Sequence, residues 1–515
     1  MPTKQEAFIQ DIESGYTFEG PSFDLGGAML DGECMTNTLV RLPLSTLNRH
    51  GLIAGTTGSG KTKTLQIIAE QLSQKGVPSL LMDVKGDLSG IAVPSDGHPK
   101  IDERHEQIGF PFEAGSSPVE LLSLSEEKGA RLRATVHEFG PVLFSKILGL
   151  NDTQTGITAV LFKYCDDNKL PLVDLEDFKK VLQYATNEGE EEIESQYGSI
   201  SSASVGAIMR RIVELEQQGA EKFFGERSFD VEDLCRKDHN GKGVVNIIRL
   251  TDIQDRPKLF STFMLQILAE IYATFPEEGD MDRPKLVLFI DEAHLVFEEA
   301  SDALLDQIEV IVKLIRSKGI GLFFVTQNPA DVPDDVLGQL GLKIQHALRA
   351  FTAKDRKAIK LAAQNYPESD YYEVDEVVTQ LGIGEALVTA LNEDGIPTPL
   401  VHTMLRAPQS RMDVLTEAEL NELIGRSALA PKYNEEIDTE SAHEILAEKI
   451  EAAKADEHQE QMKEQHEKAK QVSRRSQESM FEKILNSPTT RQIGRTVARE
   501  LTRGLLGVLG VKRRR

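Results

Sequence analysis

Residues 50–62 read HGLIAGTTGSGKT, and the run KTKTLQIIAEQLSQKG continues from Lys61. The apolar residues before Gly55 predict a buried strand, and the run after the turn has the periodicity of a helix. The segment from Gly55 to Thr62 matches GxxxxGK[ST] in full, in the strand–turn–helix setting that makes this motif specific. Residues 77–85 (VPSLLMDVK) add a second apolar strand, so the sequence predicts a βαβ unit and a parallel sheet.

A loop of this kind holds the phosphates of a nucleotide, and we predict that the nucleotide is ATP. Its glycines let backbone N–H groups turn inward, and the following helix adds the positive end of its dipole. Lys61 is expected to reach the β- and γ-phosphates, and the hydroxyl of Thr62 is expected to ligate Mg²⁺. The predicted nucleotide contacts are Gly55, Thr56, Thr57, Gly58, Ser59, Gly60, Lys61, Thr62 and Thr64.

A third apolar strand ends in two acids. Residues 285–291 read KLVLFID, and Glu292 follows directly. We predict that Asp291 holds Mg²⁺ through its water shell and that Glu292 polarises the attacking water. Signalling GTPases place their water-orienting group elsewhere, so an acid pair at this point indicates turnover rather than slow switching.

His294 completes the letters DEAH, which name a class of helicases and offer an alternative enzyme class. The chain has no downstream Ser-Ala-Thr motif and no QRxGRxGR run, both of which that class needs. His294 is expected either to pack against the strand end or to contact nucleotide or a neighbouring chain, and the sequence leaves this open.

A fourth strand, GLFFVTQ (321–327), ends in Thr326 and Gln327. The amide of Gln327 is expected to lie beside the γ-phosphate, where it senses hydrolysis and orients water. Arg316, just before this strand, is a candidate to reach a nucleotide on an adjacent subunit, although an arginine at a helix C-terminus also makes a favourable dipole contact. Arg349 is the second candidate for that role.

The chain has 515 residues, so two to four folding units are expected. Helical periodicity replaces strands in the middle of the chain, with an acidic loop predicted at 187–199 (NEGEEEIESQYGS), and composition becomes polar after Pro431. The predicted division is a short β segment (1–47), the first part of the α/β core (48–120), a helical insertion (121–240), the second part of the core (241–408), a polar helical region (409–485) and a basic amphipathic tail (486–515).

The composition limits the binding partners, the cysteine chemistry and the cellular location that we expect. The net charge of −25 argues against a mantle of basic surface around nucleic acid but not against a locally basic pore. Aromatic residues make up only 6%, so composition does not indicate a stacking platform for single strands. Three scattered cysteines predict neither a disulfide framework nor a zinc site. Without an apolar leader or a long apolar run, the sequence predicts no transmembrane segment and a cytoplasmic protein.

Basic residues gather in two places that matter for a nucleic-acid partner. The tail from Arg491 has apolar residues four apart and could bind DNA or an anionic membrane surface, dock on its own chain, or stay unfolded. The other candidates for a pore-facing surface are Arg131, Arg133, Lys354, Arg356, Lys357 and Lys360, whose facing the sequence does not reveal.

Taken together, RHGLIAGTTGSGKT, LLMDVKGDLSG, LVLFIDEAHLVF and GIGLFFVTQNPADVP resemble the HerA–FtsK superfamily of P-loop ATPases, and most closely its HerA-like branch typified by the YjgR proteins. The resemblance spans about residues 20–405. It implies a RecA-like core with an enlarged sheet, hexameric rings with composite ATP sites, and movement of DNA through a central pore, in HerA systems with a nuclease partner.

The resemblance also assigns roles by matching motifs. Lys61, Thr62, Asp291, Glu292 and Gln327 take the ATPase roles given above, and Arg316 that of a finger acting across subunits; Asp83 and Lys85 fall where relatives keep polar residues near the nucleotide. We therefore expect a ring ATPase coupled to DNA translocation or unwinding. The alternative is an ATPase that remodels protein or serves as a regulatory scaffold without acting on DNA.

Overall fold

The computed structural model describes residues 2–467 apart from positions 126, 253–255, 280, 298–301, 350–351, 436, 438, 456–460 and 465–466. The basic tail predicted from Arg491 lies outside the described residues. The chain divides into two units, 1–444 and 445–515, and the first holds the sheet and the predicted site. A helix covers 442–455, inside the region predicted to be polar and helical.

One sheet of twelve strands organises the first unit, in the order β2-β1-β12-β11-β10-β3-β9-β8-β4-β7-β5-β6. The strands are β1 (Ser22–Leu30), β2 (Glu33–Pro43), β3 (Gly51–Ala54), β4 (Ser79–Asp83), β5 (Val119–Ser123), β6 (Ala130–Arg131), β7 (Val245–Arg249), β8 (Leu286–Ile290), β9 (Ile320–Thr326), β10 (Leu342–Gln345), β11 (Glu385–Thr389) and β12 (Val401–Leu405).

The strands from β10 to β6 pair in parallel, and the four strands beyond β10 pair antiparallel. Strands β3, β4, β8 and β9 occupy the apolar runs from which they are predicted, because a strand buried on both faces is apolar almost throughout. The predicted α/β class with a mainly parallel sheet is confirmed.

Helices cover both faces of this sheet. On one face α2 (Lys61–Gln74) packs Leu65, Ile68 and Leu72 onto alternate strand residues such as Phe289 and Val325. The further helices of the core are α3 (Pro99–Ile108), α9 (Pro257–Thr274), α10 (His294–Phe297), α11 (Asp302–Ile315), α12 (Asp334–Leu337), α13 (Ala353–Ala363), α14 (Val374–Gln380), α15 (Glu417–Gly425) and α16 (Ala430–Tyr433), with short 3-10 turns η1 (Leu44–Arg49), η2 (Ser89–Ala92), η5 (Arg316–Lys318) and η6 (Pro329–Asp331).

The N-terminal segment differs from the short strands predicted for residues 1–47, because it begins with the helix α1 (Lys4–Gly15). Thr3 and Glu6 form a reciprocal capping box, and Phe8 and Ile12, one turn apart, are fully buried. Strands β1 and β2 do form, and they extend the central sheet through β12. The helix was missed because its two buried residues are too few to give a strong helical period.

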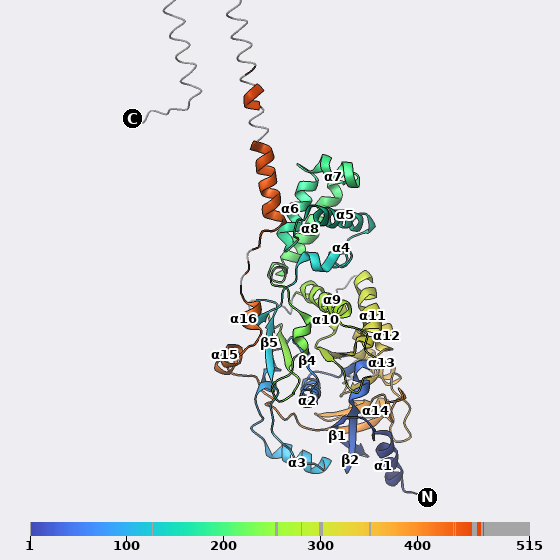
Figure 1. Ribbon diagram of the computed structural model, residues 1–515. Coiled ribbons are helices and arrows are strands. Elements are labelled where there is room, and N and C mark those ends of the chain that lie inside the picture. Colours follow the sequence, from blue (N-terminus) through green and yellow to red (C-terminus); the bar gives the residue numbers. More distant parts are fainter. Residues whose placement is uncertain are drawn as a thin grey trace, which may run out of the picture. The chain divides into compact units, whose positions relative to one another are not determined.

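The predicted insertion contains α4 (Val136–Ile147), α5 (Asp152–Asn168), α6 (Leu175–Ala185), α7 (Glu190–Tyr197), α8 (Ser202–Glu216), η3 (Ala220–Lys222) and η4 (Val231–Cys235). Figure 1 shows α5–α8 gathered at one end of the first unit, beyond α4 and α9, with α1, β1 and β2 at the other end.

The prediction of a loop at 187–199 is wrong, since the helix α7 occupies most of this segment. Ile193 is buried there, and the carboxylate of Glu192 accepts hydrogen bonds from Tyr164 and Tyr184.

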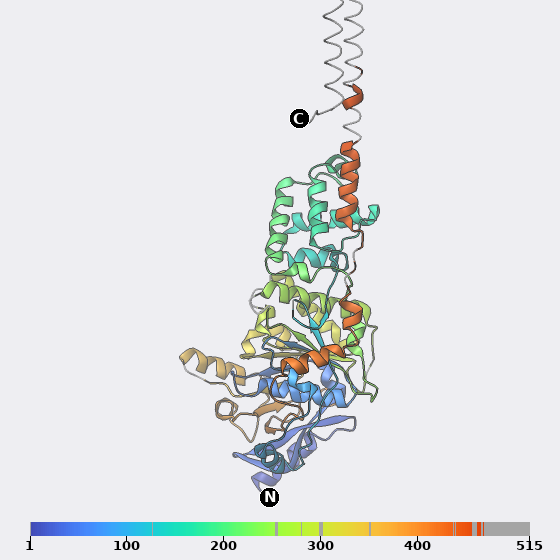
Figure 2. The same ribbon diagram turned by 90° about the vertical axis from the view of Figure 1, so that its left-hand side faces the viewer.

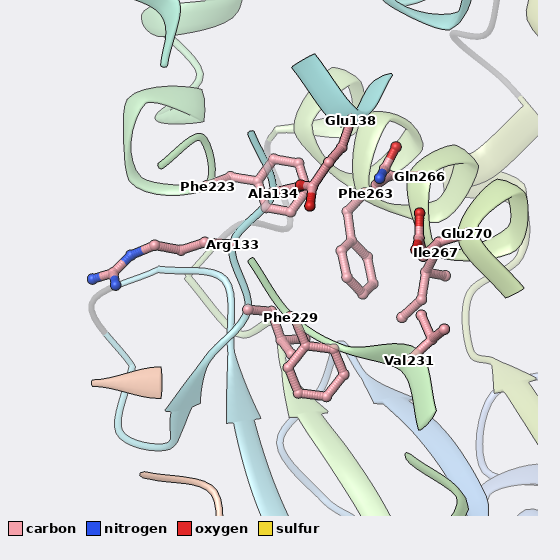
Figure 3. Close-up of a pocket in the computed structure, with 11 residues that line it drawn as sticks. Arg133, Ala134, Glu138, Phe223, Phe229, Val231, Phe263, Gln266, Ile267 and Glu270 are labelled. Atoms are coloured by element: carbon pink, nitrogen blue, oxygen red, sulfur yellow. The ribbon is translucent and has the colours of Figure 1, made fainter. Parts of the chain in front are cut away.

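A small apolar pocket lies where the insertion meets α9, lined by Phe223, Phe229 and Phe263 (Figure 3). Two of the predicted basic candidates lie near it. Figure 3 shows Arg133 pointing away from the pocket, and its guanidinium donates to the carbonyls of Glu226 and Tyr433 at 2.9 and 3.3 Å. Arg131 likewise donates to the carbonyl of Ser125, so both guanidinium groups are engaged by backbone carbonyls.

Hydrogen bonds join the segment after β12 to α2. The carboxylate of the buried Glu70 accepts from the backbone N–H groups of Gln409 and Ser410 at 2.8 and 2.9 Å. This ties the beginning of the region predicted at 409–485 to the core. Among the described residues, no helix combines the length and apolar character that crossing a bilayer requires.

A buried histidine directly before β3 is hydrogen-bonded to both α11 and β9. His50 is 2% exposed; its Nε2–H donates to the carbonyl of Val312 at 2.8 Å, and its Nδ1 accepts from the N–H of Leu322 at 3.1 Å. This arrangement needs a neutral ring. Burial, with a smaller contribution from the charge of Arg316, lowers the pKa of His50 from 6.5 to about 4.

We predict that His50 makes stability depend on pH. In the unfolded chain this histidine binds a proton below pH 6.5, whereas in the folded protein it binds one only below about pH 4. The stability that neutral His50 contributes to the folded state is therefore lost as pH falls through that window. The full loss would be about 3 kcal/mol. Urea unfolding of His50→Asn, which tolerates the positive φ of this position, should show a stability deficit that shrinks between pH 7.5 and 5. The exposed His239→Asn is the control; a constant deficit would contradict the account.

Candidate active site

Three strand ends define the site. Strands β3, β9 and β8 are neighbours and run parallel, so their carboxyl ends meet at one edge of the sheet. The glycine-rich loop follows β3, Gln327 follows β9, and Asp291 and Glu292 follow β8. The sheet thus gathers at one edge the loop, the amide and the acid pair that the sequence singles out.

The loop from Gly55 to Gly60 is shaped by close approach to the segment after β10. Gly55 has φ +153°, and a Cβ placed on it would lie 2.5 Å from the Cβ of His346. Thr56 donates from both its backbone N–H and its hydroxyl to the carbonyl of Ala347, at 2.9 and 3.0 Å. The loop is therefore fixed against β10 as well as between β3 and α2.

Lys61 begins α2 and turns back over the loop. Its ammonium group donates to the carbonyls of Gly55 and Thr56 at 2.6 and 3.1 Å. Burial and the charge of Lys85 lower the pKa of Lys61, and the nearby carboxylates of Glu292 and Asp291 oppose this shift. The cation is held at the centre of the loop, where its charge faces the positions expected for phosphate oxygens.

The two threonines of α2 differ in their surroundings. Thr62 lies half-buried in the first turn, beside the loop. Thr64, predicted to contact the nucleotide, is buried, and its hydroxyl is paired with Nε2 of His346 at 2.8 Å and with the carbonyl of Gly60 at 3.3 Å. The hydroxyl of Thr64 is therefore already paired within the protein, and it supports the loop rather than facing the expected nucleotide position. Burial and the charge of Lys61 lower the pKa of His346 to about 4, so this partner is neutral.

Asp291 is almost fully buried, with 3% of its surface exposed. Its Oδ2 has no hydrogen-bond partner among the described residues. Burial raises the pKa of Asp291 to about 7; the charge of Glu292 adds to the rise, and that of Lys85 opposes it. A buried oxygen that lacks a partner suits a cation, because metal binding would compensate the charge that burial disfavours.

Glu292 is the most connected group of the site. It has φ +48°, an uncommon backbone conformation for a residue with a side chain. Its carboxylate forms an ion pair with Lys85, lies 3.4 Å from Nδ1 of His294, and accepts from the amide of Gln327 at 3.5 Å. Burial alone would raise the pKa of Glu292, but the hydrogen bond and charge of Lys85 outweigh it and lower the pKa.

Gln327 bridges the loop and the acid pair. Its Oε1 accepts from the hydroxyl of Thr57 at 3.3 Å, while its Nε2 donates to Glu292. One side chain therefore touches both the phosphate loop and the predicted base. His294, whose role the sequence leaves open, contacts the Glu292 carboxylate.

Asp83 positions Lys85 without facing the loop itself. The carboxylate of Asp83 accepts from the backbone N–H groups of Gly86, Asp87 and Leu88 at 2.7, 3.1 and 3.2 Å. It is 1% exposed and fixes the turn that follows β4. Because β4 pairs with β8, this turn brings Lys85 to Glu292.

The two predicted arginines lie in different places. Arg349 donates to the carbonyls of Thr379 and Leu381, so it caps the end of α14. Arg316 is exposed in η5, before the first residue of β9, and its guanidinium makes no hydrogen bond or ion pair with another described residue. Seven strand residues separate η5 from Gln327, or about 20 Å at the usual rise.

Sequence reasoning missed the residues that hold the loop from outside. The N–H of Gly384 donates to the carbonyl of Ser59 at 3.2 Å. Arg104 donates to the carbonyls of Ile383, Gly384 and Leu405 at 3.0 to 3.1 Å, which fixes this contact. The only sequence signal is the pattern GIG at 382–384, which by itself indicates a turn.

A parallel core with a glycine-rich loop, an acid pair on the next strand but one, and a bridging glutamine defines a P-loop ATPase. The family model for the helicase HerA-like C-terminal region matches residues 29–514. The chain therefore belongs to the helicase HerA-like C-terminal family.

Two relatives are named DNA double-strand break repair helicase HerA. The protein of Sulfolobus acidocaldarius is 19% identical over 71% of this chain and 67% of its own length. That of Saccharolobus solfataricus is 22% identical over 75% of this chain and 69% of its own length. The chain thus spans about two thirds of these relatives. Among solved structures, the bacterial conjugative coupling protein TrwB aligns with a TM-score of 0.48 and 15% identity, covering 79% of this chain and 94% of that one.

The bridge made by Gln327 leads to a prediction about turnover. Gln327→Ala should lower kcat about 10²-fold, because it removes the group that we predict to orient water beside Glu292. ATP affinity should stay within about threefold, since Lys61 and the loop remain. Steady-state turnover and equilibrium binding of a fluorescent ATP analogue separate the two effects. Thr57→Val removes only the loop side of the bridge and should cost less; an equal loss of affinity and turnover in Gln327→Ala would contradict a catalytic role.

Proposed function

We propose that this protein is an ATP-driven motor that acts on DNA as a homo-oligomeric ring, with six subunits expected. The observation that carries the proposal is the contact of Gln327 with both Thr57 and Glu292. A side chain so placed changes partners when phosphate is bound or lost, which is what a motor requires of its sensor. The names of the relatives support DNA as the substrate.

The residues present fit ATP and Mg²⁺. The buried Oδ2 of Asp291 has no described partner, and Thr62 lies beside the loop in the first turn of α2, so these two would hold the metal. When bound, Mg²⁺ would neutralise charge on the β- and γ-phosphate oxygens. Lys61 would supply a fixed positive charge to the same phosphates.

The remaining roles in catalysis fall to side chains of the protein around Glu292. Lys85 keeps Glu292 ionised, as a group that accepts a proton or polarises water must be. Asp83 holds the turn that presents Lys85. Glu292 has a left-handed backbone conformation, and its carboxylate contacts the amide of Gln327. The predicted base and the predicted sensor therefore lie next to each other.

We expect duplex DNA to stimulate ATP turnover and Glu292→Gln to abolish it. The substitution keeps the size of the side chain but removes its charge, so kcat should fall at least 10²-fold with nucleotide binding retained. Glu33→Gln, at an exposed position in β2, is the matched control. Robust turnover by the wild type that ignores every nucleic acid would favour the protein-remodelling alternative instead.

The ring is supported by the position of Arg316. It lies at the amino ends of the parallel strands, whereas its own loop lies at their carboxyl ends. A guanidinium there would act on ATP only from a neighbouring copy. Arg349 is less suited, because two backbone carbonyls already engage it.

Mixing two inactive chains tests this arrangement. Arg316→Ala alone should lower turnover by 10³-fold or more if its charge stabilises the transition state across subunits. Combining Arg316→Ala chains with Lys61→Ala chains should restore part of the activity, because some interfaces regain both groups. Lys318→Ala, in the same turn, is the control and should stay near wild type. A mixture no more active than its components would remove Arg316 from this role.

A nuclease partner, a cytoplasmic location, membrane contact through the tail and the division into six segments remain predictions from the sequence.

A further inference from the structure

Helix α13 carries a positive surface on a chain whose net charge is −25. Arg356, Lys357 and Lys360 are exposed and form no ion pair with any residue that the structure describes. We call these three side chains the basic face. Arg131 and Arg133, the other described candidates of this kind, are bound to backbone carbonyls.

The helix is anchored at one end and free at the other. Ile359 and Ala362 are buried in a cluster with Leu348, Val378 and Leu381. The first turns extend outward from the body of the first unit, as Figure 2 shows for the gold helix. Leu361, at 60% exposure, also faces solvent. A helix held in this way can present charge to a large partner and can tilt with its anchor.

That anchor is joined to the phosphate loop. Thr56 of the loop donates twice to the carbonyl of Ala347, and the N–H of the next residue, Leu348, donates to the carbonyl of Val378 at 3.0 Å. Leu348 and Val378 both belong to the cluster on which α13 rests. Two hydrogen-bonded steps therefore connect the loop to the base of α13.

A second connection starts at Gln327. The turn η6 (Pro329–Asp331) begins two residues after it and packs against α13. The carboxylate of Asp331 accepts from the hydroxyl of Thr326 and from the N–H of Asn328, which brace Gln327 on both sides. Gln327 is thus connected through η6 to the helix.

We propose that α13 is the DNA-contacting lever of the motor: its basic face binds the phosphate backbone, and its orientation follows the occupant of the loop through Ala347 and η6. The inference rests on the proposed function, since it names the surface by which that function meets its substrate. The cations of this helix suit the phosphate oxygens of a duplex, whose regular spacing carries no sequence information.

Charge reversal in the full chain tests the contact. Arg356→Glu, Lys357→Glu and Lys360→Glu are combined, and Lys100→Glu, Lys169→Glu and Arg210→Glu, equally exposed elsewhere, form a control with the same change of charge. Affinity for a fluorescent duplex is measured by anisotropy at several salt concentrations with a non-hydrolysable ATP analogue. Thermal unfolding confirms that both variants fold.

The α13 variant should bind at least tenfold more weakly than the control variant. The slope of log affinity against log salt should also fall by about one for each cation lost. Equal binding by the two variants, with the wild type binding tightly, overturns the role of α13 and leaves the motor proposal standing. A wild type that binds no duplex at any salt concentration overturns both.

Coupling has its own test. In the wild type, duplex affinity should differ severalfold between the ATP analogue and ADP. Gln327→Ala leaves the basic face intact but removes the side chain from which the connection through η6 starts. In this variant the difference in duplex affinity between the two nucleotides should become small or disappear. A nucleotide dependence that survives in this variant overturns the connection through η6.

Discussion

The parallel pairing of β3, β9 and β8 is the constraint on which the rest of the molecule depends. Parallel strands place their carboxyl ends at one edge, so loop, amide and acids converge without being near in sequence. With β9 between the other two, Gln327 can reach Thr57 on one side and Glu292 on the other. Antiparallel pairing of any of the three would send its polar end to the far edge. The four antiparallel strands accordingly lie outside this centre, beyond β10.

The second organising feature is a set of four charges held in a poorly solvated place. Lys61, Lys85, Asp291 and Glu292 influence one another's pKa values, and burial works against the charged form of each. Lys85 and Glu292 relieve this by pairing, which leaves Lys61 on loop carbonyls and Asp291 with a bare oxygen. A triphosphate with its metal carries the charges that this arrangement lacks, because the anion suits Lys61 and the cation suits Asp291. The site is built for its ligand more than for its own stability.

How much of this could be read from the sequence depends on whether the signal is local. The loop, the acid pair and the glutamine each sit at the end of an apolar run, so their positions could be predicted. Strand β10 (LKIQ) is only four residues long and half polar, and β12 (VHTML) alternates on an antiparallel sheet, so neither shows a long apolar run. The contacts of His346, Gly384 and Arg104 with the loop or its supports join segments hundreds of residues apart, and no local pattern encodes them.

The chain is acidic although DNA is its proposed substrate, and here too a local property differs from the average over the whole chain. A polyanion is repelled by an acidic body, so contact is favoured only where cations are exposed and unpaired. Several basic side chains near the core are engaged: Arg104, Arg133 and Arg349 hold carbonyls, and Lys85 holds a carboxylate. The basic face of α13 is not engaged in this way. An acidic exterior with a few free cations confines a polyanion to one path, whereas a uniformly basic exterior would bind it anywhere and let it stall.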